Sequence, residues 1–530
     1  MNRKKKIWSV LLVGCMLTTL LAGCGKDTGG AENNPNSGNG TGKETAAEKL
    51  AFSISFSTGG NAHIESSADI NKDKWVLELE KMSNTDLDLR IVSHKEFDQK
   101  MSLMFAGSDI PDVVGNLRGG PTTPSMSGSV EAGVFMPLDD LLKEYAPNLM
   151  KMVSKSAWEE VSLDGKIYGI PSWLDNPSRR ATFVRTDLME KAGITETPKT
   201  VEQYMDMLRA FKKMGVENPF QYRENFKYAD TFLGAYDVLP FQFMELNGEV
   251  VPKFFQVENM TKALEAYKTM YDEGIIPKDF ASVTQADFNR NIAAGKVGMW
   301  ASNGEGLLNF RLNMKSVDPA AKISILPSPT GLDGKGGLGL YSSIANTYYI
   351  NNKVGEKKAI EIIKFFDWLV SEEADTFFSF GIEGDTYTMD NGAVNYKWPE
   401  SKEQIDEAAF RANQLWFVRE LTYNKKQSSL TEDGKDVISA FENVLSKEGR
   451  GGIMFMTNLD SFTKYPDLAS TGDTGPKFIL DSMVKMIYGK QPISEWPQVL
   501  EEYRKKGGNE IIKEATERWN NKDNVVDRTR

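Results

Sequence analysis

The sequence predicts an α/β protein with two or more lobes, and three features of the chain support this prediction. Its 530 residues exceed the chain length that a single hydrophobic core usually stabilises. Short runs typical of strands alternate with amphipathic runs typical of helices along nearly the whole chain. Beyond the N-terminal signal, no segment has 18 consecutive apolar residues, so the sequence predicts no later membrane span.

The chain begins with the pattern of an export signal. Residues 3–6 are basic. Residues 7–22 form an uncharged, largely apolar run that is too short to span a bilayer comfortably. Leu21-Ala22-Gly23-Cys24 resembles the bacterial lipobox, in which Cys24 would be diacylated and become the mature N-terminus. The alternatives are a plain secretory signal, with Cys24 incidental, or an uncleaved anchor. We therefore predict a signal peptide over residues 1–23 and a lipid-anchored protein on the outer face of the cell membrane.

A polar tether separates this signal from the folded sequence. Residues 24–49 are rich in Gly, Asn, Ser, Thr, Glu and Lys and have almost nothing to bury. The first predicted strand is Leu50–Phe56, in which Phe52, Ile54 and Phe56 alternate with small polar residues. A helix through Trp75 to Met82, a strand at Leu87–Val92 and a helix at Glu96–Ala106 follow.

The alternation of strands and helices continues through the rest of the chain. Predicted strands are Thr182–Arg185, Val297–Trp300, Ile323–Leu326 and Thr347–Ile350, and predicted helices are Val201–Lys213, Met260–Tyr271 and Lys357–Val370. The last hundred or so residues read as mainly helical. This order favours largely parallel sheets.

Charge and cysteine content exclude several classes of function. The net charge is −11, and it becomes −15 without residues 1–23, which carry four basic and no acidic side chains. An acidic chain without a basic cluster is not expected to bind nucleic acid. Cys15 lies in the signal and Cys24 would carry lipid, so the mature chain has no disulfide or thiolate site. Only His63 and His94 supply imidazole, and neither lies in a zinc or nucleophile motif. We predict no cofactor and no enzyme activity.

Several motifs occur in an order that identifies a family resemblance. They are Gly133–Asp140, Asp164–Pro171, Val184–Leu188, Pro198–Glu202, Gly295–Met299 and Gly381–Thr388. From Phe52 to near Trp519 the chain resembles the extracellular solute-binding proteins of sugar ABC transporters, and it is most similar to the large lipobox-bearing subgroup that takes up oligosaccharides and uronate-containing fragments. The resemblance implies a two-lobed periplasmic-binding-protein fold with a ligand cleft between the lobes and several hinge crossings. One lobe would contain residues 50–178 and 336–390, and the other residues 179–335 and 391–530.

The resemblance also implies a function. The protein would capture an oligosaccharide as a monomer and deliver it to the permease subunits of an ABC transporter. A binding lipoprotein for a peptide or another polar solute is one alternative. A lipid-anchored glycoside hydrolase or polysaccharide lyase, using carboxylates such as Glu305 and Glu383, is the other. Some relatives carry a calcium loop after the helix at 201–213, but residues 212–218 here lack its oxygen ligands, so we predict no metal.

Two tryptophans at predicted strand ends are the main candidates for contact with a sugar. A pyranose has apolar C–H faces and a rim of hydroxyls, which suits an aromatic ring with polar neighbours. Trp300 ends a strand and is followed by Asn303, and this point in the chain carries a stacking tryptophan in related sugar-binding proteins. Trp173 precedes Arg179 near the first expected crossing between lobes. Packing in a core is the alternative for both tryptophans.

The remaining candidates lie in loops that follow predicted elements. Asn116 and Arg118 come after a buried strand, where open α/β sheets hold ligands. Tyr341 lies in a short Gly-Leu-Tyr-Ser-Ser segment and is a candidate for the cleft. Glu383 and Tyr387 lie at the expected return crossing, where Glu383 would either accept hydrogen bonds from sugar hydroxyls or brace the hinge.

Overall fold

A computed structural model describes residues 48–107, 109–117, 128–174, 176–419 and 423–528. Residues 49–530 belong to a single unit of the chain. The predicted signal peptide, Cys24 and Arg118 lie outside the described residues. Among the described helices, none combines the length and the apolar character that a membrane crossing needs.

The first lobe is built on a five-stranded sheet of order β2-β1-β3-β13-β6. Its strands are β1 (Leu50–Ser57), β2 (Thr85–Val92), β3 (Val113–Leu117), β6 (Gly169–Trp173) and β13 (Ile344–Ile350). Strand β1 runs parallel to β2 and β3, with Ile54 opposite Leu89, whereas β13 runs antiparallel to β3 and β6. The alternation in β1 predicted this strand correctly, and Phe52, Ile54 and Phe56 are all buried.

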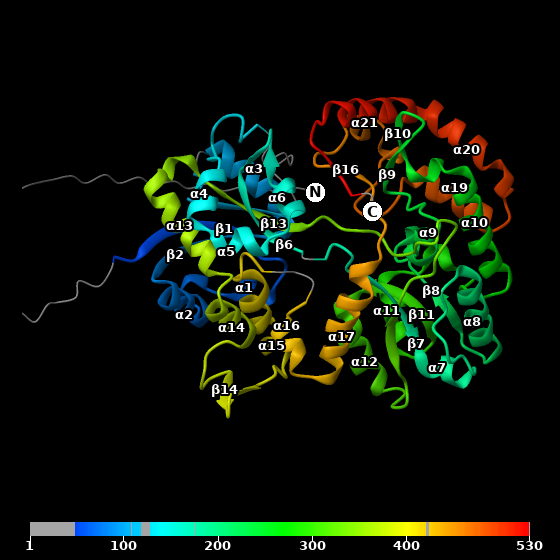
Figure 1. Cartoon of the computed structure of the whole chain (residues 1–530), viewed down its shortest axis with the longest axis horizontal. Helices are drawn as coiled ribbons and strands as arrows, with labels where there is room; N and C mark the ends of the chain where they lie inside the picture. Colours follow the sequence, from blue (N-terminus) through cyan, green and yellow to red (C-terminus); the bar gives the residue numbers. More distant parts are fainter. Residues whose placement is uncertain (1–47, 108, 118–127, 175, 420–422, 529–530) are drawn as a thin grey trace, which may run out of the picture. The chain divides into compact units, whose positions relative to one another are not determined.

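Helices cover this sheet and come from both halves of the chain. They are α1 (Ala62–Ser66), α2 (Lys74–Ser83), α3 (Phe97–Gly107), α4 (Asp139–Tyr145), α5 (Pro147–Met152), α6 (Lys155–Glu160), α13 (Glu356–Trp368), α14 (Glu372–Phe380) and α15 (Lys402–Ala409). Figure 1 shows α13, far along the chain, beside the strands of the N-terminal segment. Two hairpins, β4–β5 (Ser162–Leu163, Lys166–Ile167) and β14–β15 (Tyr387–Asp390, Ala393–Tyr396), complete this part.

The hydrophobic core of the first lobe extends further along the chain than predicted. Its cluster of buried residues includes Phe410, Leu415, Phe417 and Val418. The next buried residues of the other lobe begin at Val437, in α17 (Glu432–Asn443). The return crossing therefore lies between Val418 and Val437, after α15, rather than at residue 390.

The second lobe contains a four-stranded sheet of order β12-β7-β11-β8. Its strands are β7 (Arg180–Arg185), β8 (Asn218–Gln221), β11 (Val297–Asn303) and β12 (Ile323–Leu326). Strand β7 is antiparallel to β11 and β12, whereas β8 and β11 are parallel. In each of these two sheets one strand, β13 or β7, runs against all the others, so the prediction of largely parallel sheets holds there apart from that strand.

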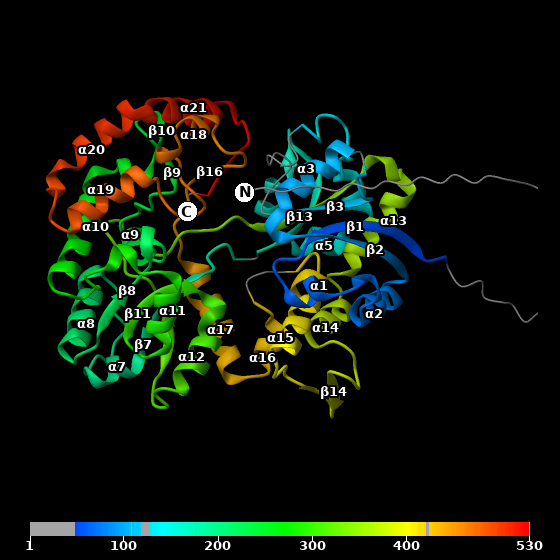
Figure 2. The ribbon, with the colours of Figure 1, turned by 180° about the vertical axis from the view of Figure 1, so that it is seen from behind.

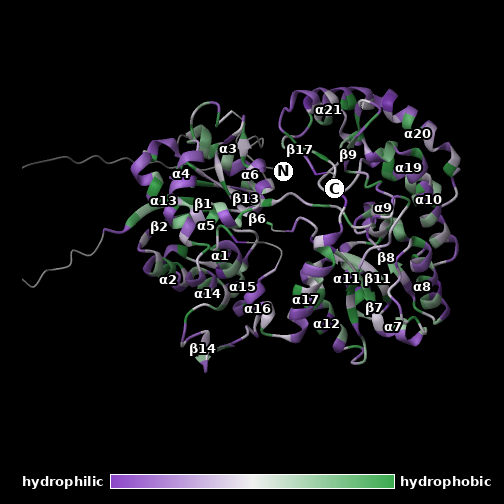
Figure 3. Ribbon diagram, in the orientation of Figure 1, coloured by the Kyte–Doolittle hydropathy of each residue, from purple (hydrophilic) through white to green (hydrophobic). Residues whose placement is uncertain are grey.

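Helices of the second lobe pack on this sheet and on one another. They are α7 (Thr186–Lys191), α8 (Val201–Lys213), α9 (Asp230–Ala235), α10 (Val257–Asp272), α11 (Gln285–Ala293) and α12 (Leu307–Lys315). Helix α8 begins at the predicted residue because Thr200 and Gln203 form a capping box. Figure 2, which views the molecule from behind, shows α8 alongside β8 and β11. In Figure 3 the helices carry hydrophilic and hydrophobic stretches in alternation, as amphipathic helices do.

The C-terminal tail is mainly helical, as predicted, but it also supplies strands. Its helices are α16 (Lys425–Ser429), α17, α18 (Asp460–Lys464), α19 (Lys477–Ile487), α20 (Trp496–Tyr503) and α21 (Asn509–Asn521). Strands β16 (Ile453–Phe455) and β17 (Val525–Asp527) join β9 (Phe243–Leu246) and β10 (Glu249–Pro252) in a second sheet of order β10-β9-β16-β17. The tail therefore completes the second lobe.

Candidate functional site

Two connections between the lobes run side by side. Residues 174–179 link β6 to β7, and residues 327–343 link β12 back to β13. The Leu174 backbone N–H donates to the Ser343 carbonyl at 2.8 Å, and the Tyr341 N–H donates to the Pro177 carbonyl at 2.9 Å. These hydrogen bonds couple the two connections, and side chains on both are held close together.

Several predicted site residues meet at these paired connections. Arg179 Nη2 lies 3.7 Å from Glu305 Oε1, and the Arg179 guanidinium lies 5.1 Å from the centre of the Tyr341 ring. The Arg179 carbonyl accepts a hydrogen bond from the Gly304 N–H at 2.8 Å, which fixes the loop after β11 against this arginine. Asn303 is the last residue of β11 and lies two residues before Glu305.

Burial raises the pKa of two of these groups. Burial raises the pKa of Glu305, and the positive charge of Arg179 opposes that rise. Burial raises the pKa of Tyr341 to about 12, so its hydroxyl is a neutral hydrogen-bond donor and acceptor at neutral pH.

Polar atoms around the paired connections are shielded from solvent and still have hydrogen-bonding capacity. Within the described residues, Asn176 Nδ2, Ser178 Oγ, Arg179 Nε and Glu305 Oε2 have no hydrogen-bond partner. A buried polar atom without a partner costs about 1–3 kcal/mol. These atoms include both donors and acceptors, the combination that a molecule rich in hydroxyl groups would satisfy.

An ion-pair network that the sequence did not predict adjoins this region. Arg180, the residue after Arg179, is 1% exposed and forms ion pairs with Asp230 and with Asp473 of the tail. Lys227 forms a second ion pair with Asp473. The adjacent Arg179-Arg180 pair was visible in the sequence. No local pattern relates Arg180 to Asp230, which is 50 positions away, or to Asp473, which is 293 positions away.

The two candidate tryptophans lie in hydrophobic cores. Trp300 is 0% exposed, with its ring stacked on Phe183 at 5.7 Å and edge-on to Phe310 at 5.2 Å. Trp173 is 3% exposed and belongs to the core of the first lobe. Neither ring presents an open face in this conformation. Their contact with a sugar remains a prediction.

The other predicted residues lie apart from Arg179. Glu383 is exposed, and Tyr387 packs against Phe380 at the base of the β14–β15 hairpin. Among the described contacts, neither Glu383 nor Tyr387 meets Arg179 or Tyr341. Asn116 is buried in β3, where its side chain is a hydrogen-bond partner of Tyr349. Their roles as ligand contacts remain predictions as well.

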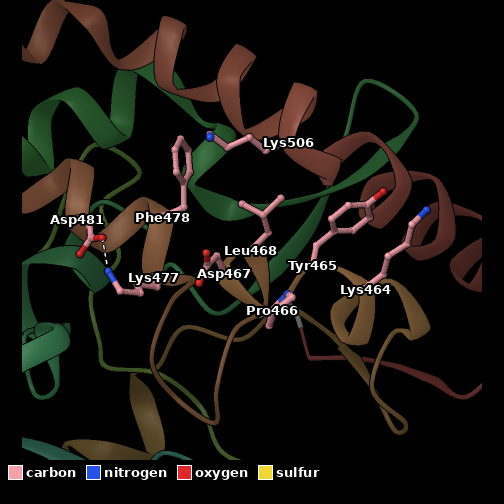
Figure 4. Close-up of a pocket in the computed structure, with 9 residues that line it drawn as sticks. All are labelled: Lys464, Tyr465, Pro466, Asp467, Leu468, Lys477, Phe478, Asp481 and Lys506. Carbon is pink, nitrogen blue, oxygen red and sulfur yellow. Dashed lines mark hydrogen bonds and ion pairs between the residues drawn. The ribbon is translucent and has the colours of Figure 1, made fainter.

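A pocket of about 390 Å³ lies in the tail and contains none of the predicted residues. Figure 4 shows Lys464, Lys477 and Lys506 around it, with the rings of Tyr465 and Phe478. Each lysine lies near an acidic side chain, in the pairs Lys464–Glu510 at 2.6 Å, Lys477–Asp481 at 2.5 Å and Lys506–Glu502 at 3.4 Å. The positive charge of this pocket is therefore largely balanced.

Comparison with known proteins gives consistent matches. The family model described as bacterial extracellular solute-binding protein matches residues 68–376. The chain is 25% identical over 460 residues to the polygalacturonan/rhamnogalacturonan-binding protein YtcQ of Bacillus subtilis, a match that covers 84% of this chain and 88% of that protein. It is 24% identical to the lipoprotein LipO of the same organism, covering 82% and 86% of the two chains.

A solved structure shares the fold. It is an HMO-binding, ABC-transporter-associated solute-binding protein from Bifidobacterium longum infantis, with a TM-score of 0.63 and 17% sequence identity. The match covers 88% of this chain and 98% of that one. The likeness extends over both lobes, so the arrangement of two α/β lobes with repeated crossings is that of solute-binding proteins.

Proposed function

The chain belongs to the family of bacterial extracellular solute-binding proteins, and from this membership we propose that it captures an oligosaccharide for an ABC transporter. In this proposal it is a lipid-anchored receptor on the outer face of the cell membrane and carries out no chemistry on its ligand. The names of two similar proteins, a polygalacturonan/rhamnogalacturonan-binding protein and a lipoprotein, support the ligand class and the anchor.

One structural observation carries the proposal. Solvent-shielded donors and acceptors without partners gather where Arg179 and Tyr341 meet on the paired connections between lobes. Sugar hydroxyls both donate and accept, so they would satisfy atoms that are otherwise costly to bury. A ligand held by residues on both connections would favour a closed arrangement of the lobes only to the extent that it binds that arrangement more tightly.

We expect the protein without its first 48 residues to bind an oligosaccharide and return it unchanged. The test is a thermal-shift screen against plant oligosaccharides, followed by prolonged incubation and mass analysis of each ligand that raises Tm. An Arg179→Ala variant should lose most of the shift, because it removes a donor and a ring contact at the connections. Shortened or unsaturated products would instead make the protein a hydrolase or lyase, and a shift with peptides alone would change the ligand class.

We expect Cys24→Ser to release the protein from the membrane. The acyl chains on Cys24 would supply about 0.8 kcal/mol for each buried methylene, and the remaining tether residues are polar. Cell fractionation and acyl labelling measure the effect, and Cys15→Ser serves as the matched control, because Cys15 lies inside the predicted signal. Unchanged membrane retention and labelling in Cys24→Ser would contradict the lipobox assignment.

A further inference from the structure

The connection formed by residues 327–343 is fixed to a different lobe at each of its ends. The Leu340 N–H donates to the Arg450 carbonyl at 2.9 Å, which holds residue 340 on the second lobe. The Ser343 N–H donates to the Glu160 carboxylate of α6 at 2.8 Å, which holds residue 343 on the first lobe. Bending of this connection is therefore left to the two residues between these anchors.

Ser343 is bound from three parts of the chain at the point where the connection enters the first lobe. Its carbonyl accepts the Leu174 N–H of the other connection at 2.8 Å. Its hydroxyl lies 2.8 Å from Ser156 Oγ of α6 and accepts a hydrogen bond from Arg528 Nη1 at 2.6 Å. Ser343 is also 0% exposed. The position of this residue is thus set by the first lobe, the other connection and the C-terminal tail together.

Arg528 brings the second lobe to this point. Its backbone N–H, directly after β17, donates to the Gly452 carbonyl at 2.9 Å, so its main chain belongs to the second lobe. Its guanidinium reaches the first lobe and forms an ion pair with Glu160. The Arg528 and Glu160 side chains are 8% and 0% exposed, so the ion pair is shielded from solvent. We call Glu160, Ser343 and Arg528 the C-terminal pivot.

A shielded ion pair constrains geometry more than it adds stability. The attraction between the charges is largely offset by their lost hydration, and apolar side chains of similar volume often replace such a pair without loss of stability. A guanidinium is planar, however, and it satisfies a carboxylate and a hydroxyl only in certain orientations. The Arg528 side chain therefore specifies how β17 and α6 lie relative to each other.

The C-terminal pivot lies where a rotation of the lobes moves atoms least. Interactions centred on a hinge residue persist through a hinge motion, whereas contacts far from the hinge must break. Ser343 directly follows the two residues at which the connection can bend, and it binds both Glu160 and Arg528. The ion pair can therefore be retained while the lobes open and close.

A second close contact between the lobes occurs where the chain makes its return crossing. Helix α16 is bound to α14 of the first lobe, because Lys426 Nζ lies 2.6 Å from Glu372 Oε1. Helix α17 packs into a core of the second lobe through Val437. A side chain at Gly434 of α17 would overlap the Ser428 carbonyl oxygen of α16, so the two helices touch through their backbones. Two fixed points define one axis of rotation.

We propose that the C-terminal pivot is a non-covalent joint between the lobes and, together with the contact between α16 and α17, restricts them to rotation about one axis. Such a joint belongs to the two-lobed fold and would act with any ligand. Its consequence for binding is entropic. Lobes that already share one axis lose less freedom when a ligand holds them together, so less of the binding free energy is spent on ordering them.

A distance measurement beside the C-terminal pivot tests the proposal without a ligand. Residues 49–530 form a unit separate from residues 1–48 and contain no cysteine, so introduced cysteines carry the only spin labels. Glu159→Cys labels α6, and Glu517→Cys labels α21, the helix that leads into β17; the native side chains are 48% and 62% exposed. Pulsed EPR gives the distribution of distances between the labels. We expect it to be narrow, because labels beside a pivot keep their separation when the lobes rotate.

Removal of both charges should broaden this distribution. Glu160→Met/Arg528→Met deletes the ion pair and leaves neither partner as a buried lone charge, so the chain should still fold. Arg528→Lys keeps the charge but not the planar fork, and it should also broaden the distribution, by a smaller amount. It decides the question by itself if the double variant does not fold.

The control deletes a buried ion pair that lies inside one lobe. Arg185 and Asp187 are each 4% exposed and lie 2.7 Å apart in the second lobe. Arg185→Met/Asp187→Met should leave the distribution narrow, whatever its effect on Tm. A broad distribution before any of these changes, a distribution that stays narrow in both pivot variants, or equal broadening in the control would each overturn the C-terminal pivot.

Discussion

Replacing Trp300 with alanine should lower the free energy of unfolding by about 3–5 kcal/mol. The side chain is 0% exposed and packs against both Phe183 and Phe310 in the core of the second lobe. Truncation would remove its apolar contacts and leave a cavity that the rigid strands β7 and β11 cannot close. Denaturant unfolding of the protein without its first 48 residues measures the change.

An exposed tryptophan provides the matched control for this variant. Trp398 is 49% exposed, so Trp398→Ala should cost well under half as much stability. Ligand affinity must be measured on folded Trp300→Ala as well. A loss of about 2 kcal/mol in binding would support the stacking role predicted from the sequence, because hot-spot residues lose that much. Unchanged affinity with lost stability would make Trp300 a core residue only.

Glu160→Ala should lower the free energy of unfolding by a similar amount, because it breaks a buried ion pair. Glu160 ends α6 in the first lobe, is 0% exposed at its side chain and forms an ion pair with Arg528 of the C-terminal tail. It also accepts the Ser343 N–H at 2.8 Å, and Arg528 donates to Ser343 Oγ at 2.6 Å. Removal of the carboxylate takes the ion-pair partner from a buried guanidinium, which costs about 3–5 kcal/mol.

The neighbouring residue offers a control with the same chemistry. Glu159 lies 3.1 Å from Lys155 in an exposed ion pair, and exposed pairs contribute little, so Glu159→Ala should change stability by less than about 0.5 kcal/mol. The double variant Glu160→Met/Arg528→Met should recover much of the loss, because it removes both charges. If Glu160→Ala and Glu159→Ala were equally stable, the ion pair would not join the tail to the first lobe in solution.

Local patterns predicted most of the regular elements. The alternation of Phe52, Ile54 and Phe56 with small polar residues predicted β1, although the strand is buried on both faces from Phe52 to Ser57. The helical pattern over residues 201–213 predicted α8 with the bounds that the structure has. These signals are local, since the burial of one face of a strand or helix is written in consecutive residues. The order of the motifs along the chain carried the resemblance to the family, and that resemblance implied the two-lobed fold.

The candidate site was predicted only in part. The structure brings Arg179 to Tyr341 and to Glu305, both of which lie more than a hundred positions further along the chain. Trp300 illustrates the limit, because a tryptophan at a strand end looks the same in sequence whether its ring faces a ligand or a core. Which face of β11 is covered depends on Phe183 and Phe310, which belong to other elements.

The sequence by itself determined the class of fold, the positions of its main strands and helices, the acidic charge and the export signal pattern. Only the tertiary structure decided which strand of each lobe's main sheet runs against the others, the late return of the chain after Val418, and the meeting of Asp473 with Arg180. The physical reason is the distance along the chain over which each effect acts. Propensity and periodicity act over a few residues, whereas strand pairing, core closure and buried ion pairs join residues that are close only after the chain has folded.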